Sequence, residues 1–138
     1  WVKKHYPYEC VISADEIKKT LPGYTDEKHG EFYQEAVKVA KEQLFERVKR
    51  GDKLIVFDSG SINSNYSREI VKDLYLYEYQ IDLVIFTADI SICINRDKNR
   101  PQSVGEEVIR RKNEKAPEAL WAILPFMTNL RRINSLGE

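Results

Sequence analysis

Two aspartates stand directly after short apolar runs, where a carboxylate could do chemistry. Asp15 follows the run at residues 9–12, and Asp58 closes the run at residues 54–57. Ligands of parallel α/β sheets bind beyond the carboxyl ends of the strands, so both acids stand where a proton acceptor or a Mg²⁺ contact is needed. Other readings remain open. Ser13 and Glu16 have the spacing of a capping box, which would make Asp15 a helix-start residue, and Asp58 opens a turn-forming Asp-Ser-Gly sequence.

Two arginines provide a second possible site. Arg96 and Arg100 are four residues apart and would share one face of a helix. Paired guanidinium groups can clamp phosphate oxygens and stabilise a transferring phosphoryl group. The alternative is a pair of surface arginines partnered by Asp97. Residues 101–105, Pro-Gln-Ser-Val-Gly, complete a candidate lid over residues 96–105.

The elements that must position these groups alternate between strands and helices. Continuous apolar runs predict strands at residues 9–12, 54–57 and 81–86, with the last two buried on both faces. Apolar spacing predicts helices over residues 31–50, 67–79 and 90–99, and after Gly105 with a break at Pro117. Residues 20–30 form a loop long enough to carry function. The pattern predicts one α/β domain over residues 1–138 with a parallel sheet.

The amino-acid composition argues against several classes of function. The chain has 22 Lys plus Arg and 22 Asp plus Glu, so it lacks the net positive charge of a protein that coats nucleic acid. No apolar run is long enough for a membrane span, and no signal peptide is visible. Cys10 and Cys93 fit buried thiols in a reducing cytoplasm, and neither His5 nor His29 has a partner at metal-ligand spacing.

Taken in order, the motifs resemble the P-loop kinases of the phage-type polynucleotide kinase and zeta-toxin group. The resemblance covers about residues 1–112. Its motifs are Ser-Ala-Asp-Glu-Ile-Lys at 13–18, the run ending in Asp58, the strand at 81–86, Arg-Asp-Lys-Asn-Arg at 96–100, and Val-Gly-Glu-Glu-Val-Ile-Arg-Arg at 104–111.

The resemblance implies a role for each candidate residue. Asp15 corresponds to the general base that takes the proton of the acceptor hydroxyl. Lys18 stands where an arginine often grips the acceptor phosphate, and Asp58 and Arg68 stand where the acceptor site is shaped. Arg96 and Arg100 match catalytic lid arginines that neutralise the ATP phosphates. ATP and Mg²⁺ are the implied cofactors, with Asp58 contacting the metal through water.

The phosphate loop of that group is absent from the chain. No G-x-x-x-x-G-K-[ST] sequence occurs, and this loop supplies the backbone cradle and lysine for the phosphates. Residues 1–6 stand where the helix after the loop would be. We therefore expect a P-loop NTPase-like sheet whose first strand and Walker A loop precede Trp1, and a chain that is inactive by itself.

Three functional hypotheses follow. The first is an ATP-dependent kinase that transfers the γ-phosphoryl group to a polynucleotide 5′-hydroxyl. The second is a kinase for a small hydroxyl acceptor, such as a nucleoside or a nucleotide sugar. The third is a non-catalytic kinase-fold binding module, which would use the aromatic segment 75–79 together with Trp121 and Phe126 as a partner surface. Sequence is silent on the oligomeric state.

Overall fold

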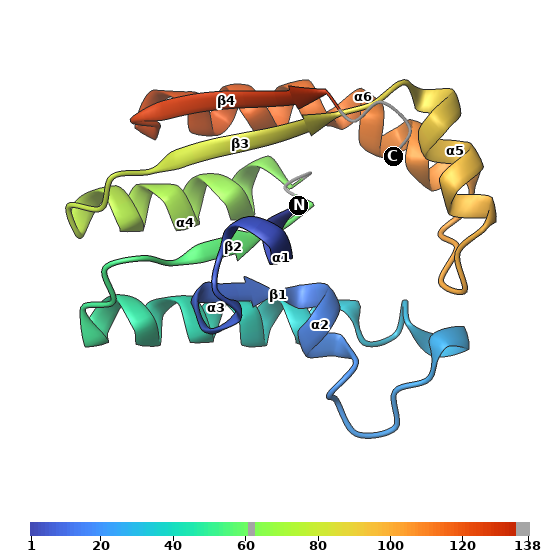
Figure 1. Ribbon diagram of the computed structural model, residues 1–138, viewed down its shortest axis with the longest axis horizontal. Coiled ribbons are helices and arrows are strands. Elements are labelled where there is room, and N and C mark those ends of the chain that lie inside the picture. The colour runs from blue at the N-terminus through green and yellow to red at the C-terminus, as the bar shows by residue number, and fades with distance from the viewer. Residues whose placement is uncertain (61–62, 135–138) are drawn as a thin grey trace. The chain divides into compact units, whose positions relative to one another are not determined.

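Residues 1–60 and 63–134 are described by a computed structural model (Figure 1). The chain divides into two compact units, Trp1–Gly60 and Ser61–Glu138. Each unit combines helices with a two-stranded parallel sheet. The predicted α/β class with parallel strands is therefore confirmed, whereas one domain over residues 1–138 stays a prediction.

The first unit is organised around the β1–β2 pair. Its helices are α1 (Val2–His5), α2 (Ala14–Lys18) and α3 (Tyr33–Arg50), with 3₁₀ turns at Tyr8–Cys10 and Asp26–Lys28. Strand β1 (Val11–Ser13) lies parallel to β2 (Val56–Asp58), and Ser13 is paired with Asp58. The predicted first strand therefore begins two residues later than expected, because Glu9 and Cys10 belong to a 3₁₀ turn.

Helix α3 supplies most of the core of this unit. Its buried residues recur along one face, as the spacing predicts, and they are Ala36, Ala40, Leu44 and Val48. Ile12 of β1 is also buried, and α3 contacts both β1 and α2. Gly51 ends the helix with φ 79°, and its N–H donates to the carbonyl of Val48. The predicted helix stop is confirmed, because a left-handed residue here favours glycine.

The second unit pairs β3 with β4 and packs three helices together. Its elements are α4 (Ser64–Leu76), β3 (Asp82–Thr87), α5 (Ile90–Lys98), α6 (Glu106–Ile123), a 3₁₀ turn (Leu124–Phe126) and β4 (Asn129–Asn134). Helix α6 packs against both α4 and α5. The buried apolar residues of the three helices are Ile70 and Val71 on α4, Ile94 on α5, and Ala119 and Ile123 on α6.

Three sequence predictions for this unit are wrong. Helix α6 continues through Pro117. The proline is exposed, and Ala119 and Ile123 beyond it are buried, so packing holds the helix across one missing backbone hydrogen bond. Strand β4 lies where a helix was expected, because it pairs with β3 over its full length. Helix α4 ends at Leu76 rather than residue 79.

The apolar runs at residues 54–57 and 81–86 are less buried than expected. Strand β2 covers only Val56–Asp58, and Leu54 before it is 47% exposed. Phe86 in β3 is also 47% exposed. Each run is paired with one neighbour in a two-stranded sheet, which leaves its side chains fewer contacts than a strand in the centre of a larger sheet would have. The prediction that these two strands are buried on both faces is therefore wrong within the described residues.

Candidate functional site

Asp15 and Asp58 lie at the same edge of the β1–β2 sheet. Strand β1 passes directly into α2 at Ser13, so Asp15 falls in the first turn of that helix. Asp58 is the last residue of β2 and is paired with Ser13. Because the strands are parallel, their carboxyl ends meet at one edge, as the sequence predicted for these two acids.

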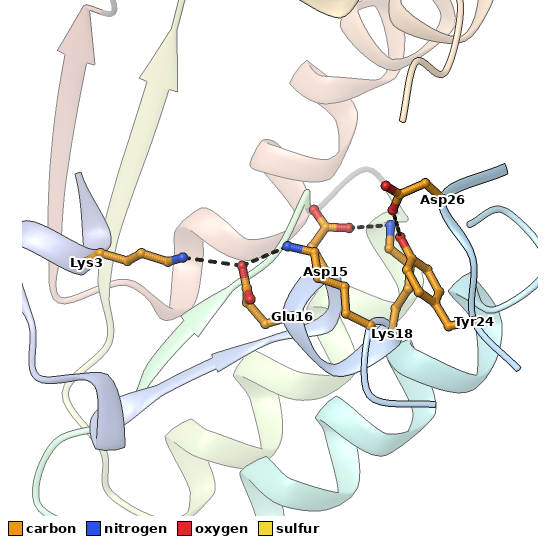
Figure 2. A network of polar contacts seen from close by, with 7 residues as sticks. Lys3, Asp15, Glu16, Lys18, Tyr24 and Asp26 are labelled. Carbon is orange, nitrogen blue, oxygen red and sulfur yellow. Dashed lines mark hydrogen bonds and ion pairs between the residues drawn. The ribbon is translucent and has the colours of Figure 1, made fainter. Parts of the chain in front are cut away.

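Lys18 is joined to this pair of acids. Its Nζ donates to Asp15 Oδ1 at 2.9 Å across one turn of α2 (Figure 2). The lysine is buried, with 6% of its side chain exposed, whereas 68% of the Asp15 side chain is exposed. The buried ammonium therefore holds a carboxylate that faces solvent.

The capping box predicted at the start of α2 is wrong. Ser13 occupies the cap position, but its side chain makes no capping hydrogen bond. Glu16 turns to lysines instead: its Oε1 accepts from Lys19 Nζ at 3.3 Å and from Lys3 Nζ at 3.5 Å. The hydrogen bond from Lys19 is the main reason that the pKa of Glu16 lies below its usual value. Glu16 and Asp15 therefore have different partners.

The loop after α2 adds two polar residues that sequence reasoning missed. Tyr24 Oη donates to Asp26 Oδ1 at 3.0 Å, and Figure 2 draws both residues in the same polar network as Asp15 and Lys18. The length of the loop at residues 20–30 marked it as a possible functional segment, but nothing in the sequence singled out these side chains. Their position depends on how the loop folds back, which spacing does not encode.

Asp58 has a raised pKa. Partial removal of water from its carboxylate is the largest cause, followed by the negative charges of Asp15 and Glu16. Asp58 as a residue is exposed, so solvent screens this effect. The result shows that the three acids share one electrostatic neighbourhood.

The predicted arginines belong to the second unit. Arg68 lies exposed on α4, and Arg96 is half-buried in the last turns of α5. Helix α5 ends at Lys98, so Arg100 stands beyond it, exposed, with its backbone N–H bonded to the carbonyl of Asp97. The prediction that Arg96 and Arg100 share one helix face is therefore wrong, because the helix stops between them.

Asp97, between the two arginines, is bonded to the segment that follows. It is 4% exposed. Its Oδ2 accepts from Ser103 Oγ at 2.6 Å and from the Gly105 N–H at 3.0 Å, and its Oδ1 accepts from the Val104 N–H at 3.1 Å. The Ser103 hydroxyl is the main cause of the lowered pKa of Asp97, and the charge of Arg100 contributes less. Asp97 therefore anchors the loop rather than pairing directly with an arginine.

The candidate residues thus fall into two groups. Asp15, Lys18 and Asp58 are brought together in the first unit, and Arg68, Arg96 and Arg100 are carried by the second. Among residues 1–60 and 63–134, no three His, Cys, Asp or Glu side chains gather as ligands for a metal ion. Over the same residues, no helix has the length and apolar character needed to cross a membrane.

Comparison with known proteins identifies the family. A family model described as an AAA domain matches residues 1–120, which is most of the chain. No curated protein matches the sequence. The family has a P-loop NTPase-like, nucleotide-binding fold and includes kinases. The chain belongs to this AAA-domain family.

Proposed function

We propose that the protein is an ATP-dependent kinase that transfers a phosphoryl group to a hydroxyl, with a polynucleotide 5′-end as its acceptor. The observation that carries the proposal is the arrangement at the end of β1. An exposed carboxylate, Asp15, is held by the buried Lys18 beside Asp58 at the ligand-binding edge of a parallel sheet. The order of motifs shared with the polynucleotide kinase and zeta-toxin group supports the same assignment.

In this proposal Asp15 acts as the general base. A carboxylate is ordinarily ionised at neutral pH and can accept the proton of an approaching hydroxyl. The contact to Lys18 Nζ at 2.9 Å restricts the rotamers of Asp15 and so orients its carboxylate. The burial of Lys18 favours this orienting role. A grip on the acceptor phosphate, which the resemblance implies for Lys18, remains a second prediction.

ATP supplies the phosphoryl group when it is bound, and the arginines of the second unit suit its phosphates. Within the described residues Arg100 is exposed and makes no ion pair, so its guanidinium can donate to phosphate oxygens. Arg96 would share this role, and Arg68 would line the acceptor side. Asp58, a single carboxylate, suits Mg²⁺ held through water. This activity needs a phosphate loop, and no G-x-x-x-x-G-K-[ST] sequence occurs in residues 1–138.

The acceptor can be tested with a protein that carries a phosphate loop upstream of Trp1. γ-Labelled ATP is offered with a 5′-hydroxyl oligonucleotide, and a nucleoside or a nucleotide sugar is added as competitor. We expect label on the oligonucleotide that the small acceptors do not suppress. Label on the small acceptor instead would support the small-molecule kinase, and label on neither would refute the kinase proposal.

The free thiols Cys10 and Cys93 fit a reducing, cytoplasmic setting for the reaction.

A binding module without catalysis is the second candidate. Trp121 is 73% exposed, and Tyr75 and Tyr77 are 58% and 55% exposed, which leaves aromatic surface for a partner. Calorimetry separates the two candidates. The kinase requires Mg-ATP binding by the protein with its phosphate loop, and the absence of binding would favour the module.

A further inference from the structure

We propose that Asp97 is a positioning residue for the candidate arginine Arg100, because its buried carboxylate closes the loop at residues 99–105. The proposal rests on the proposed function, since Arg100 is a phosphate-binding group only in a kinase. It replaces the expectation of a mobile lid at residues 96–105 with a loop that is fastened at its base.

One residue, Asp97, closes the loop because it forms hydrogen bonds with both ends of the loop. The carbonyl of Asp97 accepts from the Arg100 N–H at 3.0 Å, where the loop leaves α5. The carboxylate of the same residue accepts from the Val104 and Gly105 N–H groups at 3.1 Å and 3.0 Å, where the loop enters α6. Hydrogen bonds to an ionised, buried acceptor are stronger than those between neutral groups. Asp97 therefore fixes the path of the chain on both sides of Arg100.

The Asp97 carboxylate bonds to the segment that leads into α6. Gly105 is the residue before α6 and has φ 88°, a conformation that favours glycine. A glycine has no side chain that could accept a hydrogen bond at the helix start, where serine, threonine or aspartate ordinarily does so. The Asp97 carboxylate accepts instead from the two N–H groups just before the helix, those of Val104 and Gly105, and the Ser103 hydroxyl adds a donor at 2.6 Å.

Arg100 is the group whose placement depends on this closure. It follows the end of α5, so no helical backbone holds it, and within the described residues no ion pair fixes its guanidinium. A loop that is ordered before a ligand binds loses less conformational freedom on binding. The same closure would have little effect on Arg96, which lies inside α5.

Hydrogen exchange tests the closure in the 138-residue chain and needs no activity. In Asp97→Ala, exchange of the Val104 and Gly105 amides should speed up by roughly tenfold or more, because each loses a charged acceptor. Asp97→Asn should keep part of the protection, since one amide oxygen can still accept from Val104. The matched control is Asp89→Ala, which removes the carboxylate that accepts from Ser91 at the other end of α5 and should leave these amides unchanged. Unchanged exchange in Asp97→Ala would overturn the proposal.

A double-mutant cycle tests positioning in a protein in which a phosphate loop has been joined upstream of Trp1. Asp97→Ala should raise the KM for ATP and lower kcat by roughly tenfold, as expected for a displaced charge-stabilising group. The same substitution in an Arg100→Gln background should have little further effect. Equal losses in both backgrounds would show a merely structural role and overturn the proposal. If Asp97→Ala does not fold, Ser103→Ala takes its place with a smaller effect in the same direction. An inactive wild-type protein would refute the kinase assignment, and the exchange experiment would still decide the closure.

Discussion

At the scale of single residues, the ion pair between Lys18 and Asp15 joins a buried cation to an exposed anion. The two side chains lie one helical turn apart on α2, and their exposed fractions differ by a factor of about ten, 6% against 68%. Because the carboxylate of this pair is exposed, solvent screens the attraction, and the pair adds little to stability. Its value in the proposed mechanism is the orientation of the base.

Replacement of Lys18 by methionine should separate orientation from acceptor binding. Lys18→Met keeps the length of a buried side chain and leaves no buried charge, so stability should change by less than about 1 kcal/mol. The kcat of phosphoryl transfer should fall roughly 10- to 100-fold with an unchanged KM for the acceptor, because Asp15 loses its fixed rotamer. Steady-state kinetics measure both constants.

Lys19→Met is the matched control for this prediction. Lys19 is exposed and pairs with Glu16 rather than Asp15. Its replacement should leave kcat within about twofold, as expected of an exposed pair. A raised acceptor KM with normal kcat in Lys18→Met would instead assign Lys18 to the acceptor phosphate.

Asp58→Asn should stabilise the protein at neutral pH and have no effect in strong acid. The pKa of Asp58 is raised in the folded state, so the fold prefers the protonated carboxyl. Stability contributed by this preference is present below the ordinary pKa of 3.8 and is lost as the pH rises through the folded pKa. The side-chain amide of asparagine is uncharged at every pH, so the Asp58→Asn variant does not lose this stability. Thermal unfolding at pH 7 should show a small increase in Tm, and an equal increase at pH 3 would contradict the electrostatic explanation.

The positions of single residues were predictable from sequence where they lie at the end of a strand or shortly after it. Asp15 and Asp58 are such residues, because a short apolar run fixes both the strand and its end. The role of Asp97 was not predictable, because it depends on the loop after Arg100 folding back onto Asp97. The positions of Tyr24 and Asp26 likewise depend on how the loop at residues 20–30 folds. The spacing of residues in the sequence does not determine how either loop folds.

At the scale of elements, α3 shows how a helix is specified at its end. Gly51→Ala should destabilise the protein by about 1–2 kcal/mol, because alanine at φ 79° adopts the left-handed conformation at a steric cost. Space is not the cause, since nothing lies within 4 Å of the position of a Cβ at Gly51. Gly30→Ala is the control: its site is equally open and its φ is not positive. Chemical denaturation measures both, and equal effects would refute the conformational argument.

For helix α6 we predict the opposite effect, a substitution that stabilises the protein. Pro117 lies inside the helix and is exposed, so Pro117→Ala should restore a backbone hydrogen bond without disturbing the core. We expect a gain of at least about 1 kcal/mol, given a cost of about 3 kcal/mol for proline in a helix interior. Circular dichroism during thermal unfolding checks it. A loss of stability would mean that the proline stabilises the helix in some other way.

The same two helices show where element prediction succeeds and fails. The apolar period of α3 agrees with its glycine stop, so the whole helix was predictable. In α6 the local proline signal was misleading because packing of Ala119 and Ile123 prevails. Strand β4 could not be found from its polar sequence, Asn-Leu-Arg-Arg-Ile-Asn, since its pairing with β3 is a tertiary contact.

At the scale of the whole molecule, family membership and local geometry lead to the same chemistry. The AAA-domain match over residues 1–120 covers the first unit, the second unit as far as residue 120, and the candidate acids, lysine and arginines. The acids lie in one unit and the arginines in the other. The proposed mechanism assigns proton acceptance to the first group and charge neutralisation to the second. The balanced charge of the chain, 22 basic and 22 acidic residues, argues against binding along the length of a nucleic acid.

Single-turnover transfer by Asp15→Asn tests the central claim most directly. The experiment uses a protein in which a phosphate loop has been joined upstream of Trp1. The variant is compared with wild type and with Glu16→Gln, the neighbouring acid that pairs with lysines. Asparagine is nearly the size of aspartate but cannot accept the proton. We predict that the rate of transfer from labelled ATP falls by roughly 10²- to 10⁴-fold in Asp15→Asn, while Glu16→Gln stays within about threefold of wild type. A transfer rate in Asp15→Asn equal to that of wild type would contradict the assignment of Asp15 as the base.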